Sequence, residues 1–529
     1  MAASDNPRSL FARFLDGIEK AGNRLPDPVF IFIWLCLLML VASWVGSMLG
    51  LSAVNPATGK TVEAVNLLNA AGIVRIIEEA VKNFSAFPAL GVVLAMMIGV
   101  GVAERSGWFE AMMKSAIASA PRALIIPVII LVAILGNIAA DGAIIVLPPL
   151  AAMIFIRLGY HPLAGLACAY ATTLGAFSAN LMIGITDVLA LAFTEPAAKL
   201  VRADVPMNAA MNYYFIAAST FMLLPVAWWV TTRIVIPRMG AWQGTAEASD
   251  NDVPVDRSGE AAPGAKPQGN DGTQVTPQER KAMRAANIVL LVMVAILLVL
   301  TVPDGALLRN AQTGSLINKS PLMNGIIFVI TLLFLGPGLT YAWVAGTARN
   351  TRDIARMMGD SMSAMGPYIV LVFFAAQMLA FFTWSNLGTI LAIKGAELLS
   401  GQTGVTLIVG MIFLSAMVNL LIGSSSAKWA ILAPIFVPMM LLLDFHPAFT
   451  QMVYRVGDSI TNPITPMMPY MALMLSYAQR YVKNMGLGTL IAVLMPYTIA
   501  FSIAWTLMTV LWYLAGWPVG PGGPIHLAN

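Results

Sequence analysis

Five charged side chains lie inside otherwise apolar stretches of this chain, namely Asp141, Asp187, Lys428, Arg455 and Asp458. By insertion scales each costs roughly 2.5–3.5 kcal/mol in a bilayer, so each needs a partner or a function. Arg455 and Asp458 are three residues apart, which places them on one helix face where they could neutralise each other. An arginine fork also suits a substrate carboxylate, because it donates two parallel hydrogen bonds. The sequence leaves both interpretations open.

A motif recurs in this chain at an interval of 285 residues. Five residue types match: Leu147, Pro149, Leu158, His161 and Pro162 in the first copy, and Leu432, Pro434, Leu443, His446 and Pro447 in the second. Internal repeats with polar breaks at membrane depth are typical of secondary transporters, whose substrate site lies where the two halves meet. At this offset Arg455 and Asp458 correspond to Tyr170 and Thr173, so the charged pair occurs in one half only, which favours a functional role.

Polar residues interrupt each copy of the repeat in a hairpin. We expect re-entrant hairpins over 123–158 and 404–443, with Asn137 and Ser426 near their tips. The alternative is that each segment crosses the membrane twice as ordinary helices. A polar tip in lipid must be satisfied by protein or water, so the re-entrant arrangement fits better.

Two further stretches, 162–198 and 447–479, each predict one broken helix. Asp187 lies in the first, and Asn462 and Pro466 lie in the second. Proline removes a backbone donor and frees a carbonyl one turn earlier. Freed carbonyls and Asn, Ser or Thr oxygens suit a small hard cation, and half-helix N-termini attract carboxylates. The alternative is a proline-kinked helix whose hydroxyls only satisfy its own backbone.

The polar breaks predict a site for a coupling ion, either H⁺ or Na⁺. Its candidate residues are Asp187, Asn137, Asn462 and Asp458, and a sodium site near the hairpin tips is one form it could take. Asp187 is favoured as a proton carrier because no basic residue lies within a helical turn of it. We expect no cofactor and no other metal site, since the three histidines have no metal-ligand spacing.

The composition is that of an integral membrane protein. Of 529 residues, 58% are hydrophobic and 11% are charged, whereas a soluble domain carries about 25% charged residues. The net charge of +4 arises from basic residues beside apolar spans, which indicate orientation in a membrane and not nucleic-acid binding. The chain has no G-x-x-x-x-G-K-[ST] loop and no G-x-S-x-G motif, which argues against an ATP-driven pump and an enzyme.

These signals predict an all-α polytopic membrane protein with about nine transmembrane helices, two re-entrant helical hairpins, inverted-topology repeats and broken helices at the midplane. Basic clusters around 233–284 and 349–356 place the N-terminus in the cytoplasm and the C-terminus in the periplasm of a bacterial inner membrane. The expected order is an amphipathic cytoplasmic segment 1–28, a framework helix 29–50, repeat one 86–235, a flexible cytoplasmic linker 236–284, framework helices 285–343, repeat two 365–513 and a periplasmic tail 514–529.

Two motifs of the second half resemble the AbgT family, the p-aminobenzoyl-glutamate transporters. One is the run from Ser424 to Trp429, and the other extends from Tyr454 through Arg455 and Asp458 to Pro466. The resemblance implies a homodimer, p-aminobenzoyl-glutamate as substrate and, for some members, efflux of sulfonamide antimetabolites. It also implies functional roles for Asp187, Ser426, Trp429, Pro447, Arg455, Asp458 and Pro466.

On this basis we expect a benzoyl ring against Trp429, a glutamyl carboxylate on Arg455 and a hydroxyl contact from Ser426. The predicted function is alternating-access transport of an aromatic carboxylate, driven by an ion gradient. The first rival is an importer of dicarboxylates or other organic anions on the same architecture. An ion channel and an intramembrane enzyme are less favoured, because neither a ring of polar residues nor a nucleophile–base pair is evident. The expected partners are a small-molecule substrate, the lipid bilayer and a second copy of the chain.

Overall fold

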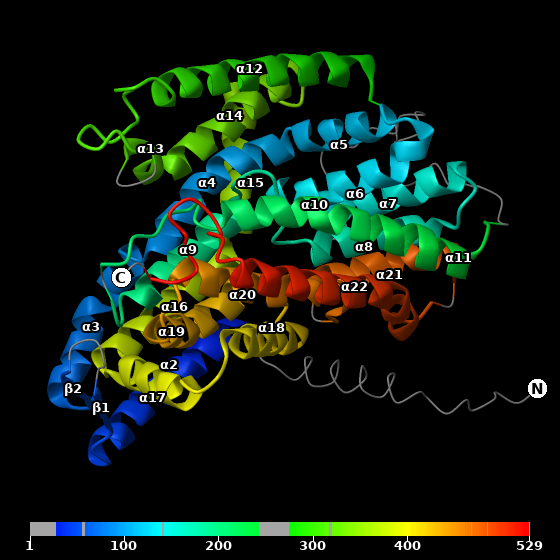
Figure 1. The fold of residues 1–529 in the computed structure, drawn as a ribbon. Coiled ribbons are helices and arrows are strands. Elements are labelled where there is room, and N and C mark those ends of the chain that lie inside the picture. Colours follow the sequence, from blue (N-terminus) through cyan, green and yellow to red (C-terminus); the bar gives the residue numbers. More distant parts are fainter. Residues whose placement is uncertain are drawn as a thin grey trace, which may run out of the picture.

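The computed structural model describes residues 28–54, 59–139, 142–202, 204–242, 275–316, 320–466, 468–483 and 485–527. It is an assembly of helices, many of which run side by side (Figure 1), with one two-stranded sheet formed by β1 (Ser52–Val54) and β2 (Thr61–Glu63). Segment 1–27 and most of the predicted linker, 243–274, lie outside the described residues.

Nine stretches within the described residues are long and apolar enough to cross a membrane. This confirms an all-α polytopic membrane protein with about nine spans. The set differs from the expected one, because it includes both arms of the second hairpin and neither broken helix. The stretches are Pro28–Met48, Ala70–Arg105, Tyr213–Met239, Pro277–Thr301, Ile326–Ala345, Gly366–Trp384, Gly404–Leu421, Ser425–Leu442 and Leu487–Leu514.

Two series of seven helices follow each other in the same order. The first is α4 (Pro88–Arg105), α5 (Trp108–Ala118), α6 (Ile125–Leu135), α7 (Gly142–Arg157), α8 (Pro162–Gly175), α9 (Ile185–Ala198) and α10 (Tyr213–Val230). The second is α16 (Gly366–Trp384), α17 (Leu387–Leu399), α18 (Gly404–Leu421), α19 (Ser425–Leu442), α20 (Pro447–Ile460), α21 (Pro469–Tyr481) and α22 (Leu487–Leu514). Short turns η1 (Arg122–Leu124), η2 (Gly136–Ala139) and η4 (Asn462–Ile464) flank the breaks, and α10 continues through η3 (Thr231–Val235) into α11 (Ile236–Met239).

The two series also share local structure at an interval of 285 residues. Helices α8 and α20 begin and end 285 positions apart, each with a histidine N-cap whose Nδ1 accepts a backbone N–H. Two isolated β-bridges repeat the interval, one between Tyr160 and Ala241 and one between Phe445 and His526. These matches agree with the predicted repeat. The inverted relation of the two units and the re-entrant path of the hairpins stay predictions.

Both broken helices have the predicted form. Helix α8 ends at Gly175 and α9 begins at Ile185, while α20 ends at Ile460 and α21 begins at Pro469. Each half is 13 or 14 residues long, too short to cross about 30 Å of hydrocarbon alone. The arms of the second hairpin meet at a turn over 422–424, beside the predicted tip residue Ser426.

Helices α18 and α20 approach each other unusually closely. A Cβ placed on Gly457 of α20 would lie 2.5 Å from the carbonyl oxygen of Ile412 and 2.7 Å from the Cβ of Ser415. Because real Cβ atoms do not tolerate such distances, glycine at this position allows the backbone of α20 to lie against α18. The hairpin arm and the helix that carries Arg455 are therefore in direct backbone contact.

The three predicted framework spans do not form one unit within a chain. Helix α2 (Pro28–Met48) packs on α16, whereas α12 (Pro277–Thr301) packs on α14 (Ile326–Ala345) and α14 packs on α4. In Figure 1 α2 and α12 lie on opposite sides of the molecule. The remaining helices are α3 (Ala70–Ser85), α13 (Pro321–Asn324) and α15 (Thr351–Ala364).

One predicted boundary was wrong. Helix α12 begins at Pro277, eight residues before the expected start of the framework at 285. The reason is a capping box, in which Thr276 Oγ1 accepts from the Glu279 N–H at 3.2 Å and Glu279 accepts from the Thr276 N–H at 2.8 Å. The charged first turns of this helix were read as part of a linker because they are not apolar.

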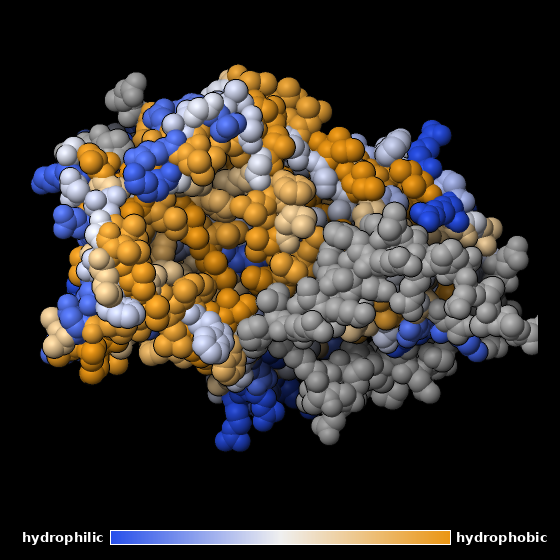
Figure 2. All heavy atoms as spheres, turned by 90° about the horizontal axis from the view of Figure 1, so that it is seen from below, coloured by the Kyte–Doolittle hydropathy of each residue, from blue (hydrophilic) through white to orange (hydrophobic). Residues whose placement is uncertain are grey.

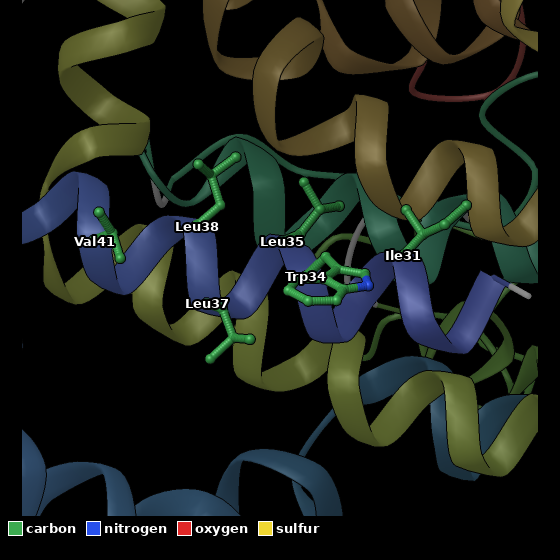
Figure 3. Close-up of a pocket in the computed structure, with 6 residues that line it drawn as sticks. All are labelled: Ile31, Trp34, Leu35, Leu37, Leu38 and Val41. Atoms are coloured by element: carbon green, nitrogen blue, oxygen red, sulfur yellow. The ribbon is translucent and has the colours of Figure 1, made fainter. Parts of the chain in front are cut away.

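The outer surface is largely apolar. Figure 2 shows hydrophobic residues over much of the visible face, with hydrophilic residues mainly near its edges. On α2, Trp34 is 64% exposed and Leu38 is 55% exposed, as expected of side chains that face lipid. They line a shallow groove together with Ile31, Leu35, Leu37 and Val41 (Figure 3). None of the six residues that line this groove carries a charged side chain that could bind a carboxylate.

The predicted tail 514–529 is folded back onto the helices as far as residue 527. The Phe215 N–H donates to the Val519 carbonyl at 3.0 Å, and the His446 N–H donates to the Ile525 carbonyl at 2.8 Å. The side chains of Val519 and Ile525 are buried. The segment after α22 therefore stabilises the starts of α10 and α20.

Candidate functional site

Arg455 and Asp187 form a buried ion pair between the two halves of the chain. Arg455 Nη1 donates to Asp187 Oδ1 at 2.5 Å, and Nη2 lies 3.4 Å from Thr186 Oγ1. Arg455 is 4% exposed and Asp187 is 3% exposed. Asp187 lies in the first turn of α9, where its other oxygen accepts from the Gly184 N–H at 2.7 Å. An acidic side chain there is stabilised by the helix dipole.

This pair decides between two interpretations that the sequence left open. Arg455 is paired with Asp187 of another helix and not with Asp458, three residues along α20. Asp187 was favoured as a proton carrier because no basic residue lies within a helical turn of it, and that reason is wrong, since it has a basic partner in space. Its role in ion coupling stays a prediction. Sequence spacing did not reveal the pair, because residues on one helix face can point to different neighbouring helices.

Asp458 has its own cationic partner, Lys428 of α19. The Lys428 ammonium contacts the Asp458 carboxylate and the carboxamide oxygen of Asn419, and both charged side chains are buried. Asp458 also accepts from Ser425 Oγ at 2.7 Å and from the Tyr454 hydroxyl at 3.3 Å. A buried charge is tolerated only when it is paired and hydrogen-bonded, and both conditions hold here.

Asn462 links the second break to the first. Its Nδ2 donates to the carbonyl of Leu174 at 3.2 Å, near the end of α8, and its Oδ1 accepts from Asn419 Nδ2 at 2.8 Å. Asn137, near the first tip, donates to the carbonyl of Thr173 at 2.9 Å. The structure therefore connects Asn462 to the Lys428–Asp458 pair through Asn419 and places Asn137 at the end of α8.

Trp429 is enclosed by protein. Its ring stacks on Tyr454 with centroids 4.2 Å apart and planes 20° apart. Its Nε1–H lies 2.9 Å from Thr194 Oγ1 and 3.1 Å from the carbonyl of Ala190, both on α9. The indole is 1% exposed. Trp429 therefore ties the second hairpin to a helix of the first half, and the ring with which it stacks here is that of Tyr454.

The hydrogen bonds of Trp429 continue into a chain of buried polar side chains. Thr194 Oγ1 lies 2.6 Å from Gln451 Oε1, and Gln451 Nε2 donates to Asn212 Oδ1 at 2.6 Å. Asn212 Nδ2 then donates to the carbonyl of Ala448 at 2.7 Å, in the first turn of α20. Hydrogen bonds in such a chain reinforce one another at low dielectric, so it holds α19, α9, α20 and the start of α10 in register.

Three predicted residues lie outside these contacts. Ser426 is half-buried on the first turn of α19, with its Oγ 3.3 Å from Ser424 Oγ. Pro447 is buried at the first position of α20, about 12 Å along the helix axis from Arg455 at 1.5 Å per residue. Pro466 lies in the break before α21. Within the described residues, none of these three is joined to Arg455, Asp187 or Asp458 by a hydrogen bond or ion pair.

Residues that the sequence did not single out as site members complete the cluster. Lys428 was recognised as a buried charge, and Asn419 as part of a tip, but neither was assigned a role. Tyr454 opens the second family motif but was assigned no role, and Thr194 and Gln451 gave no signal of their own, because their polar atoms look ordinary until the helices are assembled. The cluster that results has two cations and two carboxylates, so it is formally neutral.

Comparison with known proteins decides the family. Residues 13–527 match the model of the AbgT putative transporter family. The chain belongs to the AbgT family. It is 35% identical over 525 residues to the p-aminobenzoyl-glutamate transport protein of Escherichia coli (strain K12), an alignment that covers 99% of each chain.

Two solved AbgT structures resemble the chain throughout. The Neisseria gonorrhoeae MtrF structure, described within a class of antimetabolite efflux pumps, is 40% identical with a TM-score of 0.88 and covers 97% of this chain and 100% of its own. The Alcanivorax borkumensis YdaH transporter is 36% identical with a TM-score of 0.85, covering 94% and 100%. The AbgT chain is thus a multi-pass membrane transporter, and its relatives are named as transporters and not as enzymes.

Proposed function

We propose that this transporter carries aromatic carboxylates of the p-aminobenzoyl-glutamate type by alternating access, driven by an ion gradient. The observation that carries the proposal is the Arg455 guanidinium, buried between the two halves and bound by one carboxylate oxygen of Asp187. A guanidinium can grip a carboxylate with two parallel hydrogen bonds. The E. coli relative named for p-aminobenzoyl-glutamate supports this substrate class.

Asp187 is suited to give way to a substrate carboxylate. When Arg455 turns to the substrate, the guanidinium exchanges one carboxylate for another and stays paired, while the Asp187 carboxylate is left with the Gly184 N–H and the positive end of α9. This exchange would make binding of the anionic substrate the event that separates Arg455 of the second half from α9 of the first.

The aryl group is proposed to bind beside the Trp429–Tyr454 stack. Tyr454 lies one turn of α20 before Asp458, and its hydroxyl donates to the Ser425 carbonyl of α19 at 2.9 Å and to Asp458 Oδ1 at 3.3 Å. An aromatic substrate would stack on Trp429 by displacing Tyr454 or by extending the stack. An aliphatic dicarboxylate gains nothing from these rings, which is why the dicarboxylate importer remains the second choice.

Access to the site requires movement of the second hairpin. Arg455 and Asp458 are nearly fully buried, and Trp429 closes α19 against α9. Alternating access in repeat-built transporters moves one bundle or hairpin against the other around a site at the midplane. Both uptake and efflux fit this motion, and MtrF supports efflux of antimetabolites as the alternative direction.

The coupling ion is proposed to be H⁺ or Na⁺, with Asp187, Asp458, Asn137 and Asn462 as the residues around which it acts. Asp458 is the stronger proton-linked candidate of the two acids, because Lys428 beside it can lose a proton whereas Arg455 beside Asp187 cannot. The assembly is proposed to be a homodimer in a bacterial inner membrane, with the N-terminus cytoplasmic and the C-terminus periplasmic.

The test is transport by the purified full chain in proteoliposomes. We expect saturable movement of radiolabelled p-aminobenzoyl-glutamate that is accelerated by a proton or sodium gradient and competed by sulfonamides. Succinate is the matched competitor for the dicarboxylate alternative. Failure of p-aminobenzoyl-glutamate to move or compete, with succinate transported instead, would overturn the proposed substrate class.

A further inference from the structure

Asn137 and Asn419 make equivalent contacts at the two hairpin tips, although the two residues are 282 and not 285 positions apart. Asn137 Nδ2 donates to the carbonyl of Thr173 at 2.9 Å, and Asn419 Nδ2 donates to the carbonyl of Asp458 at 2.7 Å. Thr173 and Asp458 are 285 positions apart. A second contact, to the Ala176 carbonyl at 3.4 Å and to Thr461 Oγ1 at 2.8 Å, repeats the same interval. Both amides therefore cap the end of the helix that precedes a break.

The carboxamide oxygens of these two residues are in different electrostatic surroundings. Asn419 Oδ1 accepts from the Lys428 ammonium, which also contacts Asp458. Asn137 is 6% exposed, and its Oδ1 is buried without a hydrogen-bond donor among the described residues. At the repeat offset Lys428 corresponds to Ala143, so the first tip has no equivalent ammonium.

We infer that Lys428 is a tethered cation that fills the cation position of the second tip, so that a free monovalent cation such as Na⁺ binds at the first tip against Asn137 and not at the second. The inference rests on the proposed ion coupling and names where the free ion acts. The ammonium contacts an amide oxygen and a carboxylate oxygen, the donor atoms that a hard cation prefers. A buried amide oxygen without a donor is costly, and a cation would satisfy it.

Charge supports the same assignment. Lys428 balances Asp458, whose other oxygen is held by Ser425 at 2.7 Å, so an added Na⁺ at the second tip would place two cations on one carboxylate. At the first tip no such cation stands next to Asn137 Oδ1 within the part of the chain that the structure describes. The second tip is therefore occupied by the ammonium of Lys428, whereas the first tip binds a cation from solution.

The test measures ²²Na⁺ binding to the purified full chain, with choline as the replacement ion, and it needs no substrate. We expect one Na⁺ per chain in the wild type. Asn137→Ser should weaken Na⁺ binding at least tenfold, whereas the matched variant Asn419→Ser should leave it within about twofold. Because substrate is absent, failure of the proposed transport activity leaves this outcome unaffected.

A gain-of-binding variant tests Lys428 itself. Lys428→Met keeps the length of the side chain and removes its charge, which frees Asn419 and Asp458 for an external ion, so the stoichiometry should rise from one Na⁺ to two. Lys394→Met, at an exposed lysine of α17, is the control and should stay at one. Size-exclusion chromatography establishes that each variant is folded. Loss of Na⁺ binding in Asn419→Ser with retention in Asn137→Ser, or no binding by the wild type, would overturn the inference.

Discussion

Arg455 and Asp187 are 268 positions apart in the chain, yet the guanidinium of one donates to the carboxylate of the other at 2.5 Å. The contact joins α20, which lies in the second series of helices, to α9, which lies in the first. A transporter built from two similar halves needs a contact between them that the substrate can break. An ion pair to a guanidinium provides one, because an incoming carboxylate competes for the same donors.

Arg455→Lys should weaken binding of p-aminobenzoyl-glutamate about tenfold or more. The lysine keeps the charge and the pair with Asp187 but loses the planar fork, and a charge-assisted hydrogen bond contributes about 1.5–3 kcal/mol. Equilibrium binding to the purified protein measures the effect. Arg105→Lys, at a half-exposed arginine near Asp360, is the matched control. Undiminished binding by Arg455→Lys would show that the arginine does not grip the substrate.

Asp187→Asn should destabilise the protein by about 3–5 kcal/mol, because it leaves the Arg455 charge buried without its partner. Adding Arg455→Gln should restore part of that loss, since the double variant has no unpaired charge. Thermal or denaturant unfolding in detergent, arranged as a double-mutant cycle, gives the coupling free energy. Asp204→Asn, at an exposed carboxylate paired with Arg202, should change little. Additive losses in the double variant would contradict the direct pairing.

Much of this arrangement follows from sequence. The His-Pro starts of α8 and α20 appear in the sequence as capped helix beginnings, and the polar breaks at 176–184 and 461–468 were expected as interruptions of apolar stretches. The capping box at Thr276 was not predicted, because it lies in a stretch with the composition of a linker. Helix caps and helix breaks are determined by residues that are close in the sequence, so they can be predicted from it.

The pairing of charges could not be predicted in the same way. Helix α20 is packed between α19 and α9, so Arg455 and Asp458 meet different helices although they are one turn apart. Which acid or base each residue meets depends on how the two series of helices pack against each other. That packing cannot be read from a single sequence. The contacts of Trp429 were missed for the same reason, because Thr194 and Ala190 are more than 230 positions away from it.

Trp429→Phe should preserve the stack on Tyr454 but lose the hydrogen bonds from Nε1 to α9. We expect a loss of about 1 kcal/mol in stability from the missing bond and a change in turnover larger than the change in substrate affinity. Unfolding measurements and the separation of KM from the maximal rate check this. Thr194→Val should reproduce the effect and Thr194→Ser should not. A selective loss of affinity in Trp429→Phe would contradict this expectation and would indicate that the indole N–H contributes to substrate binding beyond the ring stacking proposed above.

Ser426→Cys should react with small water-soluble thiol reagents in at least one state of the transport cycle. The side chain is half-buried at the start of α19, near the turn of the second hairpin, whereas Ala433 in the same helix is fully buried. Labelling of Ser426→Cys in proteoliposomes, with Ala433→Cys as the control, measures access. The native Cys36 and Cys168 are buried and should contribute little background. Equal protection of both positions with and without substrate would favour an ordinary packed span over a re-entrant hairpin.

The backbone contact at Gly457 determines which parts of the molecule can move independently. Since α20 lies against Ile412 of α18 with no side chain between them, neither helix can slide or rotate without the other. The contact of Arg455 on α20 with α9, by contrast, is an ion pair for which an incoming carboxylate could compete. Helices α18 and α20 should therefore move as one body during the transport cycle, so that Arg455, the proposed substrate-binding residue, is displaced together with the first arm of the second hairpin.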